Sequence, residues 1–194
     1  MKQRNFFVFW KDMSILDKWF LDEPVSVDGT QIDGWHFTMG VPYAGPLPLT
    51  CKMYQAGREI PVSFGGLDTP YFQKSIADAI VKIDPAAVEI FPVLVDGARN
   101  KYDIVNVTSV IDAIDKSSDI ECHSEIDIIN DPSKIGRYKY VRSIVLKTQA
   151  IAESQHIFRL AKFDNDIIVS NKLKLAIEKA CPRHGGTFDP VLTI

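Results

Sequence analysis

The sequence has little cysteine and no long hydrophobic run. Three cysteines, Cys51, Cys122 and Cys181, are scattered through 194 residues, and this odd number suits a reducing compartment better than a disulfide framework. The apolar stretch at residues 6–10 is too short for the apolar region of a secretion signal. No segment approaches the roughly 20 apolar residues of a membrane helix. We therefore expect a cytoplasmic protein with no membrane partner.

An excess of one charge sign and the common catalytic motifs are also missing. The chain has 22 Lys and Arg residues against 25 Asp and Glu residues, for a net charge of −3. No strong field therefore recruits nucleic acid, and we expect no nucleic-acid partner. Gly-x-Ser-x-Gly, His-Glu-x-x-His, phosphate-binding loop and dinucleotide-binding patterns do not occur. The sequence predicts no catalytic residue and no cofactor.

A few dispersed cysteine and histidine residues are candidates for metal binding or catalysis. Cys181 and His184 have the spacing of half a zinc site, and Cys122 with His123 offers two more donors. Adjacent residues on a strand point to opposite faces, so the second pair converges poorly on a metal, and we predict no metal site. His156 starts a predicted strand and has no partner motif, which favours a structural hydrogen bond over catalysis. A small enzyme whose site is assembled from His156 and Cys181 stays an open alternative.

The clearest local pattern runs from residue 156 to residue 192. Residues 156–161 fit the period of a strand, with His156, Phe158 and Leu160 on one side and Ile157, Arg159 and Ala161 on the other. A turn is predicted at residues 163–166 and a β-branched strand at residues 167–169. Ser170 is placed to cap a helix that reaches Pro182, and residues 188–192 can return as a strand.

A second unit has the same pattern. Thr69 and Pro70 predict the start of a helix that ends before Pro85, and residues 88–95 form the strand beyond it. Residues 74–85 (KSIADAIVKIDP) align with residues 171–182 (NKLKLAIEKACP), which suggests a duplicated helix–strand unit. Amphipathic helices that end in proline also resemble one another by chance, and this alternative stays open. The alignment has four identities: Ala79 with Ala176, Ile80 with Ile177, Lys82 with Lys179, and Pro85 with Pro182.

The remaining segments complete the predicted fold. We expect strands at residues 5–10, 102–107, 121–129 and 138–146, and short helices at residues 12–21 and 110–114. Residues 49–54 and 60–64 predict a hairpin. This order indicates an α+β fold with a mixed, mainly antiparallel sheet and a few short helices. We divide the chain into a strand- and loop-rich N-terminal elaboration, residues 1–60, and an α+β domain, residues 61–194, within one continuous globule.

One surface feature stands out, an acidic run over residues 112–131 in which Lys116 is the single basic residue. Charge runs are usually solvated faces, and that interpretation stays open. The functional alternative is a patch that speeds association with a basic partner. The candidate partner-binding residues are Asp119, Glu121, Glu125 and Asp127.

Several segments together form a recognisable pattern. They are the helix at residues 72–83 with VEIFPV (88–93), YDIVNVTSVIDAID (102–115), HIFRL (156–160), IVSNKLKLAIEK (168–179) and FDPV (188–191). Their order and sequence resemble the Imm-eleven family of immunity proteins from bacterial polymorphic toxin systems. The resemblance covers about residues 60–191, and residues 35–45 more loosely. It implies a bacterial, cytoplasmic, non-enzymatic protein that binds and neutralises a cognate toxin domain. It brings no catalytic residue with it, and a secretion-associated adaptor remains an alternative.

Overall fold

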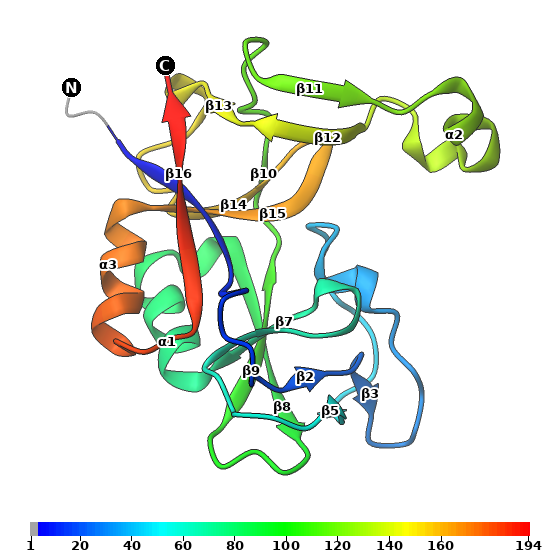
Figure 1. Ribbon diagram of the computed structural model, residues 1–194, viewed down its shortest axis with the longest axis vertical. Helices are drawn as coiled ribbons and strands as arrows, with labels where there is room; N and C mark the ends of the chain where they lie inside the picture. The colour runs from blue at the N-terminus through cyan, green and yellow to red at the C-terminus, as the bar shows by residue number, and fades with distance from the viewer. Residues whose placement is uncertain (1–3) are drawn as a thin grey trace.

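Two six-stranded sheets meet at a pair of helices in the computed structural model, which describes residues 4–194 (Figure 1). The helices are α1 (Lys74–Ile83) and α3 (Asn171–Ala180), and a short third helix, α2 (Glu125–Asn130), lies apart from them. Mixed sheets, mostly antiparallel, with short helices confirm the predicted α+β class. Single 3₁₀ turns are η1 (Gly34–Phe37), η2 (Gly66–Asp68), η3 (Pro85–Ala87), η4 (Pro132–Lys134) and η5 (Thr148–Ala150).

The first sheet has the strand order β10–β14–β15–β1–β16–β13. Its central pairs are antiparallel, and the outer pairs β10–β14 and β13–β16 are parallel. The sequence predicted β1, β14 and β16 closely. The strand bounds are β10 (Val110–Ile111), β14 (Ile157–Leu160), β15 (Phe163–Ser170), β1 (Phe6–Lys11), β16 (Gly186–Thr193) and β13 (Val145–Leu146).

The second sheet has the order β3–β4–β8–β9–β7–β6. All its pairs are antiparallel except β4–β8. Strands β8 and β9 occupy the residues that the sequence predicted. The bounds are β3 (Val25–Ser26), β4 (Leu49–Cys51), β8 (Val88–Val95), β9 (Tyr102–Val107), β7 (Pro70–Gln73) and β6 (Val62–Phe64). Two-stranded ribbons pair β2 (Phe20–Leu21) with β5 (Met53–Gln55), and β11 (Asp119–Cys122) with β12 (Tyr138–Ser143).

The two sheets repeat one arrangement. In each sheet a helix connects two strands, and these two strands flank a third strand that is antiparallel to both. In the second sheet α1 connects β7 to β8, and β9 lies between them. In the first sheet α3 connects β15 to β16, and β1 lies between them. The outer neighbours also correspond, because β6 pairs antiparallel with β7 as β14 does with β15. Strand β4 likewise pairs parallel with β8, as β13 does with β16. The repeat agrees with the duplicated helix–strand unit that the sequence suggested.

The central strands differ in origin, although their registers match. Strand β9 follows β8 in the chain, whereas β1 comes from the N-terminal end. Asp103 of β9 lies opposite Phe72 and Pro92, and Phe7 of β1 lies opposite Val169 and Pro190. Phe72 and Val169 each lie two residues before the aligned helices, and Pro92 and Pro190 lie in the strands that follow those helices, so Asp103 and Phe7 occupy equivalent places. Because β1 completes the first sheet, residues 1–60 contribute to the centre of the fold, and the proposed boundary at residue 60 stays a prediction.

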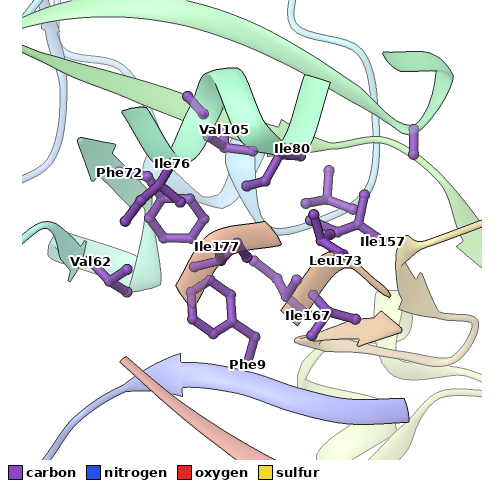
Figure 2. Close-up of a cluster of buried hydrophobic side chains, with 14 of the residues drawn as sticks. Phe9, Val62, Phe72, Ile76, Ile80, Val105, Ile157, Ile167, Leu173 and Ile177 are labelled. Atoms are coloured by element: carbon purple, nitrogen blue, oxygen red, sulfur yellow. The ribbon is translucent and has the colours of Figure 1, made fainter. Parts of the chain in front are cut away.

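The main core lies where α1 packs on α3. Ile80 of α1 and Ile177 of α3, which are equivalent positions of the repeat, are both fully buried. Figure 2 shows both in one cluster of buried side chains, which also includes Phe72 of β7 and Phe9 of β1. Burying one such side chain contributes about 1.5–3 kcal/mol. Each helix therefore covers its own sheet and also fills the core of the other unit.

A polar link joins the units at the end of α1. The Asp84 carboxylate oxygen Oδ2 is buried and accepts the backbone N–H groups of His156, at 2.7 Å, and Ile157, at 3.4 Å. These donors lie at the start of β14, in the other sheet. Because a buried backbone N–H without a partner is costly, Asp84 both ends α1 and fixes where β14 begins.

Two N-terminal predictions were wrong, and in both cases long-range pairing overrode the local pattern. Residues 12–21 form turns and β2 instead of a helix, because Asp12 accepts hydrogen bonds from the backbone and hydroxyl of Ser14. The backbone of Arg58 also pairs with Asp17 and Trp19. The hairpin predicted over residues 49–64 is absent from this described segment, since β4 pairs with β3 and β8 whereas β6 pairs with β7.

Four boundaries also differ from prediction. Helix α1 begins at Lys74, because residues 70–73 pair with β9 as strand β7. Residues 110–111 form β10 against β14, where a short helix was expected. A capping box at Ser124 ends the strand predicted over residues 121–129 and starts α2. The turn expected at residues 163–166 is strand, and the chain reverses at Lys162, whose φ of 70° is left-handed.

The shared core predicts one cooperative unfolding transition. We expect Ile177→Ala to lower the free energy of unfolding by about 2–5 kcal/mol, because it opens a cavity between the units. Leu175→Ala is the matched control on the same helix, since Leu175 is 55% exposed, and it should change stability by about 0.5 kcal/mol or less. Urea titrations followed by circular dichroism and tryptophan fluorescence measure both. Two separate transitions in the unchanged protein would contradict the shared core.

Candidate functional site

The candidate site is an arm formed by residues 119–143, which carries β11, α2 and β12. Figure 1 shows β11 and β12 running along one side of the molecule, with α2 at the end away from both termini. The two strands pair with each other in a ribbon separate from both large sheets. The arm therefore presents surface that the main core does not use.

The root of the arm is firmly attached. Val141 is buried in a cluster with strands of the first sheet, and Tyr138 packs against that cluster. The Tyr138 N–H donates to the Lys162 carbonyl oxygen at 2.8 Å. The Arg137 guanidinium also pairs with the carboxylate of Asp164, which is buried. These contacts fix the direction in which the arm leaves the body.

The tip of the arm is held by local hydrogen bonds. The Asp127 carboxylate accepts the Ser124 N–H at 3.0 Å and hydroxyl at 2.8 Å, and the Asp127 N–H donates to the Ser124 hydroxyl at 3.3 Å. This reciprocal capping box starts α2. The hydrogen bonds from Ser124, aided by the charge of Lys139, lower the pKa of Asp127 to about 2. A helix this short needs such a cap, because isolated short helices are unstable in water.

The tip also exposes apolar side chains. Ile126 is 68% exposed, Ile129 is 75% exposed, and Ile135, just beyond η4, is 68% exposed. Ile126 and Ile129 are three positions apart and so share one side of α2. Helix α2 buries none of its residues. Exposed apolar clusters of this kind mark interaction sites more often than isolated surface residues do.

The structure brings the predicted acidic residues together on the arm but compensates two of them. Arg142 Nη2 lies 2.7 Å from the Glu121 carboxylate, and Lys139 Nζ lies 3.6 Å from that of Asp127. These cations come from β12, which the acidic run does not include. Asp119 and Glu125 are exposed and form no ion pair with another residue of the described chain. Two of the four predicted carboxylates therefore stay uncompensated. Glu125 begins α2 beside the exposed isoleucines, whereas Asp119 lies opposite Ser143 at the other end of the ribbon.

A cleft of about 590 Å³ separates the arm from the segment around η1. Trp35 and Met39 line the body side and are about half exposed, whereas His123, Lys134 and Lys139 line the arm side. The Nδ1 atom of His123 has no hydrogen-bond partner among the described residues. The cleft extends the apolar and polar surface available beside the arm.

Sequence reasoning missed the isoleucines and Trp35 as surface features. A signal for α2 was present, because Ser124 and Asp127 have capping-box spacing and Ile126 and Ile129 follow it at helical spacing. The predicted strand over residues 121–129 includes both isoleucines, so the helix was not predicted. Exposure could not be deduced, since it depends on where β12 attaches to the body.

His156 and Ser170 form a buried contact at the start of α3. His156 Nδ1 and the Ser170 hydroxyl lie 2.8 Å apart, and that hydroxyl also accepts the Leu173 N–H at the start of α3. Both residues are buried, and Lys172 Nζ lies 3.5 Å from the other ring nitrogen. Burial and the nearby lysine lower the pKa of His156. This arrangement confirms Ser170 as the helix cap and keeps its hydroxyl away from solvent.

The two cysteine–histidine pairs lie in different parts of the fold. Cys122 and His123 are on the arm, whereas Cys181 ends α3 and His184 accepts the Gly186 N–H at 3.0 Å. Within residues 4–194, no group of three or more His, Cys, Asp or Glu side chains is arranged to hold a metal ion. No helix in that range is both long and apolar enough to span a bilayer.

The fold and the arm define an α+β protein that presents a separate, partly apolar surface beside a fully packed core. A family model described as the immunity protein family (Imm11) matches residues 71–192. The chain therefore belongs to this immunity protein family, as the sequence patterns suggested. The match runs from β7 to β16 and includes both helix–strand units and the arm, but not β1. Comparison with curated proteins finds no match.

The capping box predicts a measurable titration. We expect the Asp127 carboxyl to titrate near its pKa of about 2 in the folded protein, well below its ordinary value of 3.8. A lowered pKa means that the cap stabilises α2 above about pH 4 and loses this effect as the pH falls toward 2. Ser124→Ala should return the pKa of Asp127 toward its ordinary value. Ser133→Ala is the matched control, because it removes a similar hydroxyl that donates to Asp131 instead of Asp127. Carboxyl carbon chemical shifts measure both variants.

Proposed function

We propose that this protein binds and neutralises a cognate bacterial toxin domain by protein–protein contact, in the cytoplasm of the cell that makes both. Membership of the immunity protein family indicates an immunity role. The observation that carries the proposal is the arm, whose tip exposes three isoleucines that no packed cluster of the described chain includes. We assign the arm as the main contact with the toxin.

The composition of the arm suits a protein partner. Interfaces typically have an apolar centre and a polar rim, and a few anchor residues carry most of the binding energy. Ile126, Ile129 and Ile135 would form the centre, while Asp119 and Glu125 belong to the rim. Because the root is anchored through Arg137 and Asp164, the arm offers this surface already ordered. Less conformational entropy is then lost on binding.

The acidic residues should act mainly on the rate of encounter with a basic toxin. Neutralising Asp119, Glu121, Glu125 and Asp127 together should slow association and make it less sensitive to salt. We expect most of this effect from the double variant Asp119→Asn/Glu125→Gln, with a decrease of about 3- to 10-fold in the association rate at low ionic strength. The reason is that Glu121 and Asp127 already have cationic neighbours.

A charge-matched control separates this local effect from a change in net charge. Asp96→Asn/Glu153→Gln removes two exposed carboxylates that lie away from the arm. Stopped-flow association of the purified toxin domain at several salt concentrations provides the comparison. Equal rates for the two double variants would remove the acidic residues from the proposal.

The isoleucines should determine how long the complex lasts. We expect Ile126→Ala/Ile129→Ala to abolish protection when the toxin domain encoded beside this gene is co-expressed, and to weaken co-purification at least about 10-fold. These residues are exposed, so the fold should be unaffected. Leu175→Ala, an exposed leucine on α3, is the control and should protect as the unchanged protein does.

Co-expression also tests the function itself. Rescue of growth together with co-purification of the toxin domain supports immunity. Failure of the unchanged protein to rescue growth would contradict it and favour the adaptor alternative. Protection that survives loss of both isoleucines would place the toxin contact elsewhere on the protein.

A further inference from the structure

A groove crosses the second sheet on the side that α1 covers only in part. Helix α1 contacts β7 and β9, and the far half of β8 lies beyond it. There a hollow of about 560 Å³ is lined by β4, β8 and the start of β9. We call it the β8 groove, and its walls include Val27, Pro92, Leu94 and Asp103. Leu94 is 74% exposed and Val27 is 63% exposed, so apolar surface continues out of the groove.

Asp103 gives this apolar groove a buried charge. Its side chain is 3% exposed, and Oδ2 has no hydrogen-bond partner among the described residues. Lys74 Nζ lies 3.9 Å from Oδ2 but donates its hydrogen bond to Asp78 at 2.9 Å. Burial raises the pKa of Asp103, although Lys74 opposes this effect. Oδ2 is thus desolvated without a hydrogen bond in return, which is costly.

The duplicated fold shows that this position does not require a charge. Phe7 occupies the equivalent place in the first sheet, opposite Val169 and Pro190, where Asp103 lies opposite Phe72 and Pro92. The aromatic ring of Phe7 packs against the main core and Phe188. An apolar residue therefore suits this register of the fold, and packing alone would favour one at residue 103.

The chemistry of the groove points to a cationic group on an apolar stem. A lysine or arginine side chain buries its methylenes along apolar surface and keeps a charged head, which Asp103 would bind as a charge-assisted hydrogen bond. The exposed rim at Leu94 and Val27 suits the rest of a protein surface better than a small amine, which would leave that rim in water. Lys101 also lines the groove but is exposed and solvated.

We propose that the β8 groove is a second contact site for the protein partner, in which a lysine or arginine side chain of that partner pairs with Asp103 while neighbouring apolar residues cover Leu94 and Val27. This inference rests on the proposed function, because the partner is the cognate toxin domain. Asp103 lowers the stability of the free protein because Oδ2 lacks a hydrogen bond. Pairing with the partner's cation removes this cost, which strengthens binding.

The test compares Asp103→Asn and Asp103→Leu with the unchanged protein. We expect both variants to melt at a higher temperature when free, because a buried charge without a hydrogen bond is removed, and to bind the purified toxin domain about 10-fold or more weakly. Asp96→Asn, an exposed carboxylate just after β8, should change neither quantity. A variant that melts higher and binds equally well would show that Asp103 has no partner, and would overturn the inference. Immunity itself would stand, since growth rescue measures it separately.

A small probe tests the groove without the toxin. Butylguanidinium should shift the amide resonances of residues 93–95 and 103 and should lower the pKa of the Asp103 carboxyl, measured by carboxyl carbon shifts. Pentanol has a similar apolar stem without charge and should bind more weakly. The preference for butylguanidinium should disappear in Asp103→Asn. Equal shifts with both probes would reduce the groove to an apolar hollow and would contradict the cationic contact.

Discussion

The packing of α1 on α3 is the constraint on which the rest of the structure depends. Each helix joins two strands of its own sheet, and its buried side chains also fill the core beside the other sheet. Neither unit could bury its apolar surface alone, so the two sheets are fixed relative to each other through Ile80 and Ile177. Asp84 adds a polar link at the same contact by accepting two N–H groups of the opposite sheet. Because this core closes without the arm, the arm can carry exposed apolar side chains.

A feature could be predicted from the sequence when the residues that determine it are close together in the chain. Ser170, the α3 periodicity and Pro182 are close together in the chain, and the helix they predict is correct. Residues 12–21 have helical spacing, yet the backbone of Arg58 pairs with them, and no local pattern indicates a partner some forty residues away. The burial of Asp103 is likewise set by β7 and β8 on either side, so its sequence neighbours could not reveal it.

The candidate site shows the same limit in its charges. All four predicted acidic residues lie on the arm, and their role in binding stays a prediction. The charge of this surface is less negative than the acidic run alone indicates, because β12 places Lys139 and Arg142 beside Glu121 and Asp127. In the proposed contact, we assign more of the affinity to the isoleucines within that run than to the acids around them. Desolvating apolar surface usually supplies affinity, whereas exposed charges mainly affect the encounter rate.

The repeat offers a way to separate packing from function within one chain. Where the two units agree, as at Ile80 and Ile177, the shared residue type reflects the common helix–sheet contact. Where they differ, the fold permits either residue, and a costly choice needs another reason. Asp103 is such a choice, since Phe7 fills the same register without a buried charge. The arm is a second difference, because it is inserted between the units, after β10 and before β13. The two features that packing does not explain are therefore those to which we assign contact with a partner.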